Sequence, residues 1–93
     1  GRMGGVRIII HAHALIHEIT EDQIRAAFTQ GAVEKRVRRR DAKADPPRWG
    51  VVGFDNQARP LELVAVELLS GDVLIIHANY LTRGFAEEMR KRP

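Results

Sequence analysis

The 93-residue chain has no cysteine, few aromatic residues and no long hydrophobic run. Without cysteine it can form neither a disulfide framework nor a thiolate site, which fits a reducing cytoplasm, where we expect the protein to act. No apolar run approaches the roughly 20 residues that span a bilayer, and no signal peptide is visible, so we expect no membrane partner. Aliphatic side chains must form most of the core.

A chain of this length is expected to form one domain over residues 1–93, because two independent cores would be too small to be stable. Gly1 and Arg2 precede Met3 as the remnant of a cleaved expression tag would. We therefore do not expect these two residues to contribute to the fold.

Lysine is also scarce: the chain has three lysines against twelve arginines, with a net charge of +3. Residues 34–48 hold seven Lys/Arg and three Asp/Glu, so this segment carries the whole basic excess. Arginine binds phosphate through a planar, bidentate guanidinium. The segment predicts a polyanion-binding surface, although a solvated charged ribbon without a partner would have the same composition.

Hydrophobic periodicity and turn residues define the expected elements. A capping box formed by Thr20 and Gln23 predicts the start of a helix that Gly31 would end. Segment 33–40 favours a strand, although a helix would also bring its two valines together. We expect strands at 6–10, 33–40, 48–54, 61–69 and 73–80, and helices at 11–17, 20–31 and 83–92.

This order of elements, β-α-α-β-β-β-β-α, predicts an α+β fold. Helices lie before and after a block of strands, which is typical of a mainly antiparallel, twisted sheet, here of four to five strands. Residues 70–72 predict a tight hairpin between the last two strands.

The segment 73–83 is the most informative stretch of the chain. It begins as an apolar strand, becomes polar at His77 and Asn79, and passes into a helix that Thr82 can cap. A strand's period of two predicts that these two polar residues share a face with Val73 and Ile75. With Arg83 nearby, this end of the sheet could bind an anion. His77 could instead be a buried histidine that hydrogen-bonds a backbone carbonyl.

Metal-free RNA cleavage needs a base for the 2′-hydroxyl, cations for the phosphorane and an acid for the leaving oxygen. His77 near neutral pH could supply the acid or the base, and Arg48 could stabilise the phosphate. Tyr80 could stack a base, as could Trp49, which is equally suited to the core. The residues expected to bind nucleic acid are Lys35, Arg36, Arg38, Arg39, Arg40 and Tyr80.

Three of the four histidines occur close together, in the stretch H-A-H-A-L-I-H. On a helix His13 and His17 would lie on one face at a spacing that can bind zinc. A metal-dependent enzyme built on these two residues and His11 is therefore a third hypothesis. Capping or packing is the commoner role for such histidines, so we expect no metal and no other cofactor.

Three segments resemble small bacterial toxins of the RelE/ParE superfamily, in particular the BrnT-like branch. Segment 17–28 (H-E-I-T-E-D-Q-I-R-A-A-F) is similar to that branch's stretch leading into a helix. Segment 48–53 (R-W-G-V-V-G) is similar to its Arg-aromatic strand, and segment 76–83 (I-H-A-N-Y-L-T-R) to its last strand and closing helix.

The resemblance implies an endoribonuclease that cleaves mRNA, often on the ribosome, and is neutralised by a cognate antitoxin. His17, Arg48 and Arg83 match the family by position. His77 and Asn79 stand where the BrnT pattern has Ser and Arg, and the Asp-Pro of its first strand is missing. The superfamily also includes gyrase inhibitors that cut no RNA.

The leading hypothesis is a toxin-like, metal-independent endoribonuclease whose partners are RNA and an antitoxin. The alternative is a non-catalytic module that binds nucleic acid or protein through the same surface. Either protein could also form a homo-oligomer. The expected catalytic residues are His77, Asn79, Arg83, Arg48 and His17.

Overall fold

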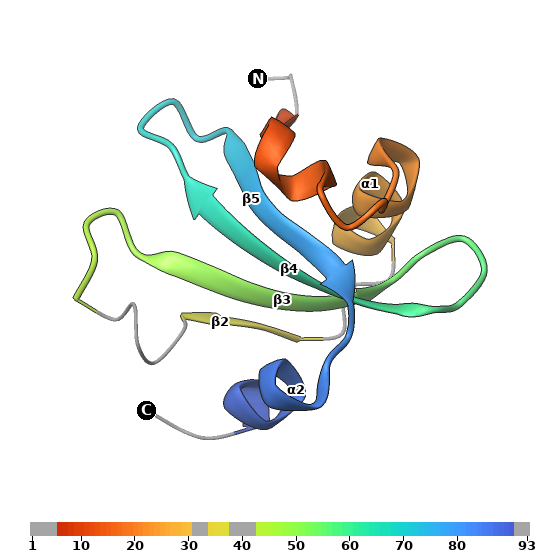
Figure 1. The fold of residues 1–93 in the computed structure, drawn as a ribbon. Helices are drawn as coiled ribbons and strands as arrows, with labels where there is room; N and C mark the ends of the chain where they lie inside the picture. The colour runs from red at the N-terminus through yellow and green to blue at the C-terminus, as the bar shows by residue number, and fades with distance from the viewer. Residues whose placement is uncertain (1–5, 31–33, 38–42, 91–93) are drawn as a thin grey trace.

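The computed structural model describes residues 6–30, 34–37 and 43–90, and over this part of the chain it has an α+β fold. One sheet lies between the helices α1 and α2 (Figure 1). The elements in chain order are β1 (Ile8–Ile10), the 3-10 helix η1 (Ala12–Leu15), α1 (Glu21–Thr29), β2 (Glu34–Val37), β3 (Arg48–Phe54), β4 (Pro60–Glu67), β5 (Val73–Tyr80) and α2 (Arg83–Arg90).

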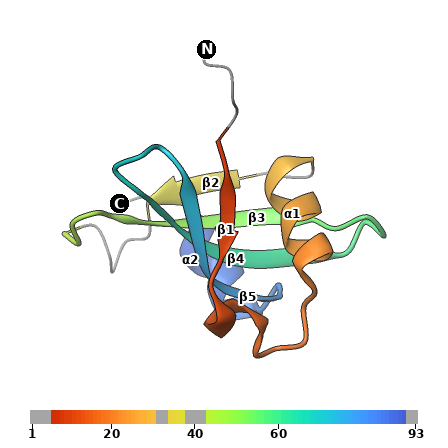
Figure 2. The same cartoon turned by 90° about the horizontal axis from the view of Figure 1, so that it is seen from above.

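The five strands have the order β1-β5-β4-β3-β2. Three pairings are antiparallel, but β1 runs parallel to β5, beside which it lies in Figure 2. The α+β class is thus as predicted, whereas the sheet is mixed. A parallel pair needs a long crossover, and the chain between β1 and β5 supplies it by passing through α1 and the other three strands.

The N-terminus of α1 has the capping box that the sequence predicts. Thr20 Oγ1 accepts a hydrogen bond from Gln23 N at 3.1 Å, and Thr20 N donates to Gln23 Oε1 at 2.9 Å. The two bonds satisfy backbone and side-chain groups that a helix start would leave unpaired. Gly31, the predicted end of this helix, lies outside the described residues.

We call the side of the sheet that α1 covers the closed face. Here α1 packs so tightly against β3 that a Cβ on Gly53 would lie 2.1 Å from the carbonyl oxygen of Ala27. Trp49 packs against this core, in the second of the two roles foreseen for it. The largest side chains with no more than 1% exposure are Ile19, Ile24, Val51, Leu61, Leu63 and Ile75.

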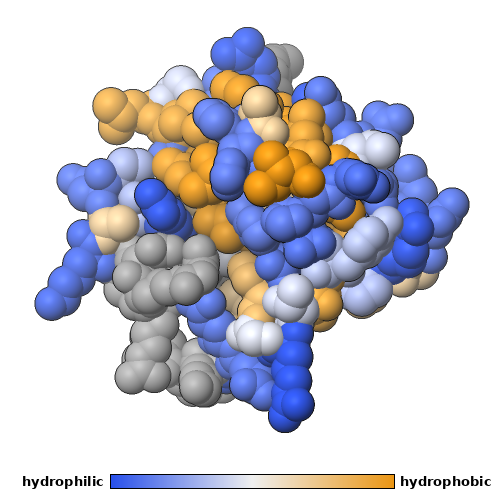
Figure 3. All heavy atoms as spheres, in the orientation of Figure 1, coloured by the Kyte–Doolittle hydropathy of each residue, from blue (hydrophilic) through white to orange (hydrophobic). Residues whose placement is uncertain are grey.

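The opposite side, which we call the open face, carries α2. Phe85 and Met89 on α2 pack with Val64 of β4 in a second, smaller core. Thr82 caps this helix as predicted, because its Oγ1 accepts a hydrogen bond from Phe85 N at 3.3 Å. In Figure 3 exposed apolar side chains gather over η1 and the β4–β5 hairpin, where Ile16 and Leu69 are exposed.

A β-bulge in β5 corrects the predicted alternation of that strand. His77 pairs with Val64, but Ile75 pairs with Ala65, so Ile76 is an extra residue in the ladder. Val73 and Ile75 belong to the core of the closed face, and after the bulge so does Ala78. His77 therefore lies on the open face, opposite Val73 and Ile75 rather than beside them, because a bulge shifts the side-chain register by one residue.

Candidate functional site

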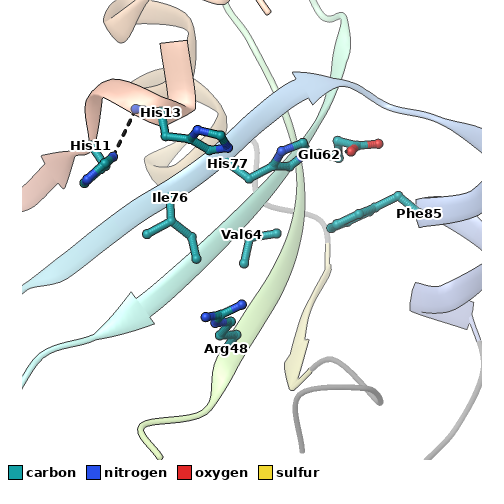
Figure 4. A pocket seen from close by; sticks show the side chains of 8 residues that line it. All are labelled: His11, His13, Arg48, Glu62, Val64, Ile76, His77 and Phe85. Carbon is teal, nitrogen blue, oxygen red and sulfur yellow. Dashed lines mark hydrogen bonds and ion pairs between the residues drawn. The ribbon is translucent and has the colours of Figure 1, made fainter. Parts of the chain in front are cut away.

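A hollow of about 470 Å³ lies on the open face, where η1, β5, β4, β3 and α2 meet. Histidines and a carboxylate occupy one part of its wall, and apolar side chains and an arginine occupy the rest (Figure 4). The residues that line it are His11, His13, Arg48, Glu62, Val64, Ile76, His77 and Phe85.

His77 is held in this wall by a short contact with a buried acid. Its Nε2 lies 2.7 Å from Glu62 Oε2, and the His77 side chain is 27% exposed. Among the residues that the structure describes, its other ring nitrogen, Nδ1, has no hydrogen-bond partner. When the neutral ring donates its Nε2 proton to Glu62, Nδ1 has a lone pair that can take a proton from a ligand.

Glu62 lies in β4 and is 5% exposed. Its Oε1 accepts hydrogen bonds from Thr82 N at 2.8 Å and from Thr82 Oγ1 at 2.6 Å. Burial raises the pKa of Glu62, but the hydrogen bonds from His77 and Thr82 outweigh this effect and lower it below its ordinary value. The carboxylate is therefore ionised at neutral pH and acts as a hydrogen-bond acceptor for the imidazole.

η1 brings the other histidines to the same edge of the sheet. β1 ends at Ile10, and the chain continues alongside β5, where His11 N donates to Ile75 O at 2.9 Å. His17 follows η1, and its ring packs edge-to-face against His77 with the centroids 5.6 Å apart. His17 and His77 were both expected at the site, and the structure brings them together.

The predicted pairing of His13 and His17 on one helix face is wrong. η1 ends at Leu15, so His17 lies beyond the helix. His11 caps η1 instead, because its Nδ1 accepts a hydrogen bond from His13 N at 3.0 Å. Over residues 6–30, 34–37 and 43–90 no group of three or more His, Cys, Asp or Glu could hold a metal ion.

Arg48 is exposed at the first position of β3 and lines the hollow. In Figure 4 its guanidinium lies at the opposite end from the histidines, with Val64 and Ile76 in between. The open face thus combines an imidazole–carboxylate pair, an apolar floor and an exposed cation. This combination can bind an anionic ligand with an apolar part and transfer a proton to or from it.

Two other predicted catalytic residues lie near this site but do not line the hollow. Arg83 is 92% exposed, and its Nε donates to Glu87 Oε2 on the next turn of α2 at 3.1 Å. Asn79 uses its Oδ1 to accept a hydrogen bond from Tyr80 N at 2.8 Å.

None of the predicted nucleic-acid-binding residues that the structure describes lines the hollow. Lys35 lies over Phe28 and Trp49, with its Nζ 5.9 and 5.4 Å from their ring centroids, so it belongs to the closed face. In β2 Arg36 pairs with Gly50. Arg38, Arg39 and Arg40 lie outside the described residues.

Tyr80 also lies away from the hollow. Its hydroxyl accepts a hydrogen bond from Gln23 Nε2 at 3.1 Å, and the Arg59 guanidinium lies 5.4 Å from its ring centroid. Arg59 and Gln23 also bind the buried carboxylate of Asp55. Burial raises the pKa of Asp55, but hydrogen bonds from Arg59, Gln23 and Gln57 lower it to about 2. This cluster braces the β3–β4 hairpin against α1.

Glu62 is the residue that the sequence reasoning missed. It stands alone as a charged residue within the otherwise apolar stretch 61–66. Strand residues of this kind are rarely buried without a partner, and His77 on the next strand is a suitable one. That signal could have identified the pair.

No family model, curated protein or solved structure matches the chain. Among the described residues, no helix is long and apolar enough to cross a membrane. The proposed function therefore rests on the geometry of the hollow and on the short sequence motifs.

Proposed function

We propose that the hollow is the active site of a metal-independent endoribonuclease of the toxin-like class that cleaves mRNA. The observation that supports this proposal is the His77–Glu62 pair, which opens onto a hollow that also contains Arg48. An imidazole with one nitrogen bound to a carboxylate and the other facing a ligand is a suitable general base.

In the proposed reaction, Nδ1 of His77 takes the proton of a ribose 2′-hydroxyl. The 2′-oxygen attacks the adjacent phosphorus, and the bond from phosphorus to the 5′-oxygen breaks. Arg48 stabilises the charge that develops on the phosphorane. The neighbouring imidazole of His17, once protonated, supplies the proton that the 5′-oxygen needs on leaving.

The other predicted residues have different roles in the proposed function. The side chains of Asn79 and Arg83 hydrogen-bond to Tyr80 N and Glu87, and in this proposal they take no part in the reaction. The part of the basic segment that follows β2 would hold the RNA backbone together with Arg48, because it joins this edge strand to the start of β3. A cognate antitoxin would neutralise the protein in the cytoplasm, and the substrate could be mRNA on the ribosome.

An RNA-cleavage assay with and without ribosomes tests this function. We expect the parent chain to cut RNA in the presence of a metal chelator, and His77→Ala to lower the rate by about 10²–10⁴-fold. RNA affinity should stay within about twofold, because His77 acts on the proton rather than on the backbone charge. Arg83→Ala is the matched control, since Arg83 is exposed and pairs with Glu87.

A parent chain that binds RNA but does not cleave it under either condition would contradict the proposal. The protein would then be the non-catalytic binding module. Cleavage that survives His77→Ala would place the chemistry elsewhere.

A further inference from the structure

We infer that Glu62 is the positioning residue of this site, and that it couples the orientation and tautomer of His77 to the seating of α2. The effect on catalysis rests on the proposed ribonuclease function. The effect on the orientation and tautomer of the imidazole is independent of that function.

The two oxygens of the Glu62 carboxylate have separate partners. Oε2 faces His77 Nε2 at 2.7 Å, whereas Oε1 accepts two hydrogen bonds from Thr82, at 2.8 Å from N and 2.6 Å from Oγ1. The carboxylate is 5% exposed, so water cannot readily replace these partners. Glu62 cannot turn toward one partner without releasing the other.

Thr82 in turn belongs to the start of α2. Its Oγ1 accepts a hydrogen bond from Phe85 N at 3.3 Å, and its carbonyl oxygen accepts one from Ala86 N at 3.0 Å. Phe85 also packs on Val64, the residue that pairs with His77 in the sheet. A continuous set of contacts therefore runs from the imidazole through the carboxylate and the threonine hydroxyl to the first turn of α2.

This arrangement selects one tautomer of the neutral ring. An ionised carboxylate only accepts hydrogen bonds, so it favours the ring that has its proton on Nε2. An amide in its place can donate to Nε2 and so favours the ring that has its proton on Nδ1. In that tautomer Nδ1 has no lone pair and cannot act as a base.

The ring nitrogens of His77 provide the test. Two-bond ¹H–¹⁵N spectra of the full labelled chain, with the His77 signals identified by His77→Gln, distinguish the two tautomers. We expect the parent chain to populate the Nε2–H form almost alone, and Glu62→Gln to raise the Nδ1–H form to half or more. In cleavage assays Glu62→Gln should lower kcat by about 10²–10⁴-fold and change KM by less than threefold.

Asp55→Asn is the matched control, because Asp55 is another buried carboxylate (6% exposed) but its partners are Gln57, Arg59 and Gln23 rather than a histidine. It should leave the His77 tautomer and kcat unchanged even where it lowers stability. Thr82→Val, which removes one bond to Glu62, should produce a smaller increase of the Nδ1–H form, and Thr82→Ser should restore the parent spectrum. If Glu62→Gln does not fold, the comparison of Thr82→Val with Thr82→Ser tests the inference instead.

An unchanged tautomer in Glu62→Gln would overturn the inference, as would an unchanged tautomer in Thr82→Val where Glu62→Gln does not fold. A parent chain that cuts no RNA but shows the tautomer change would contradict the ribonuclease and leave the positioning role intact. Cleavage that depends on His77 but not on Glu62 would contradict the positioning role in catalysis and leave the ribonuclease intact.

Discussion

The two faces of the sheet differ in how completely they are filled. On the closed face α1 lies directly on β3, and side chains such as Ile24, Val51 and Leu63 have no exposure. On the open face α2 packs with Val64 in a smaller core, and beside it the hollow remains. The closed face provides most of the hydrophobic stabilisation, and the open face retains the space that a ligand needs.

Two carboxylates are buried among the described residues, Asp55 beside α1 and Glu62 on the open face, and their partners differ in kind. Asp55 accepts hydrogen bonds from Gln57 N, Arg59 N, Arg59 Nε and Gln23 Nε2, all of which fix the β3–β4 hairpin. Glu62 binds the start of a helix and also a histidine that lines a hollow. A buried acid with a lowered pKa is therefore no mark of a site by itself. Whether a buried acid belongs to a functional site depends on the residue it binds and on whether a ligand can reach that residue.

The largest expected effect distinguishes the two faces by their packing. Leu63→Ala on the closed face should lower the free energy of unfolding by about 2–5 kcal/mol, because it leaves a cavity that the tight packing cannot fill. Ile76→Ala on the open face should cost less than about 2 kcal/mol, since its side chain already borders the hollow. Urea unfolding measures both values. Equal losses would show that the open face is packed as tightly as the closed one.

Two glycines give the next largest difference. Gly53→Ala should lower the free energy of unfolding by about 1–3 kcal/mol or more, because the new Cβ would overlap the backbone of Ala27. Gly84→Ala should raise it by about 0.5–1 kcal/mol, because nothing lies within 4 Å of that Cβ and alanine favours a helix. Thermal unfolding of the two variants is the measurement. A neutral Gly53→Ala would contradict the close contact between α1 and β3.

Much of the fold could be predicted from local sequence signals. The capping box at Thr20 and the cap at Thr82 depend on residues three apart, so the helix starts could be read directly. β3 has the predicted bounds of 48–54, because β-branched and aromatic residues sit between a proline pair and a polar turn. The parallel pairing of β1 with β5 was not predictable in this way, since it joins residues more than 60 positions apart.

The arrangement of the candidate site could be predicted only in part, because it depends on two departures from regular structure. The bulge at Ile76 moves His77 to the open face, and no residue in β5 signals a bulge. η1 ends after four residues, which separates His17 from His13 and places it against His77. Residue type identified His77 and Arg48 as candidates. Their common hollow, and the absence of Arg83 from its lining, follow from the tertiary structure.

A matched pair of basic residues tests which face of the sheet would bind RNA if the proposed function is right. Arg48→Ala should weaken the binding of a single-stranded RNA by about tenfold, because an exposed guanidinium at the hollow is lost. Lys35→Ala should change it by less than about twofold, since Lys35 lies over Phe28 and Trp49 on the closed face. Fluorescence anisotropy at fixed salt measures both affinities. A larger loss for Lys35→Ala would move the RNA-binding surface to the closed face.

The smallest expected effect is a difference in acid sensitivity between the two carboxylates. Because the pKa of each is lower in the folded protein, each contributes stability that is complete above its ordinary pKa and is lost as the pH falls. For Asp55 this loss occurs between pH 3.8 and about 2. For Glu62 it begins near pH 4.5.

Unfolding measured from pH 6 to pH 2 should therefore show a flatter slope below about pH 4 for Asp55→Asn than for the parent chain. Glu62→Gln should flatten the slope from about pH 4.5 downward. Asp72, whose pKa is lowered by hydrogen bonds from Arg7, titrates in the same range in every variant, so only differences between variants are compared. Only Glu62→Gln should also change the ring-nitrogen spectrum of His77. If Asp55→Asn changed it as well, the two faces would be coupled through the sheet, and the separation between a bracing acid and a positioning acid would fail.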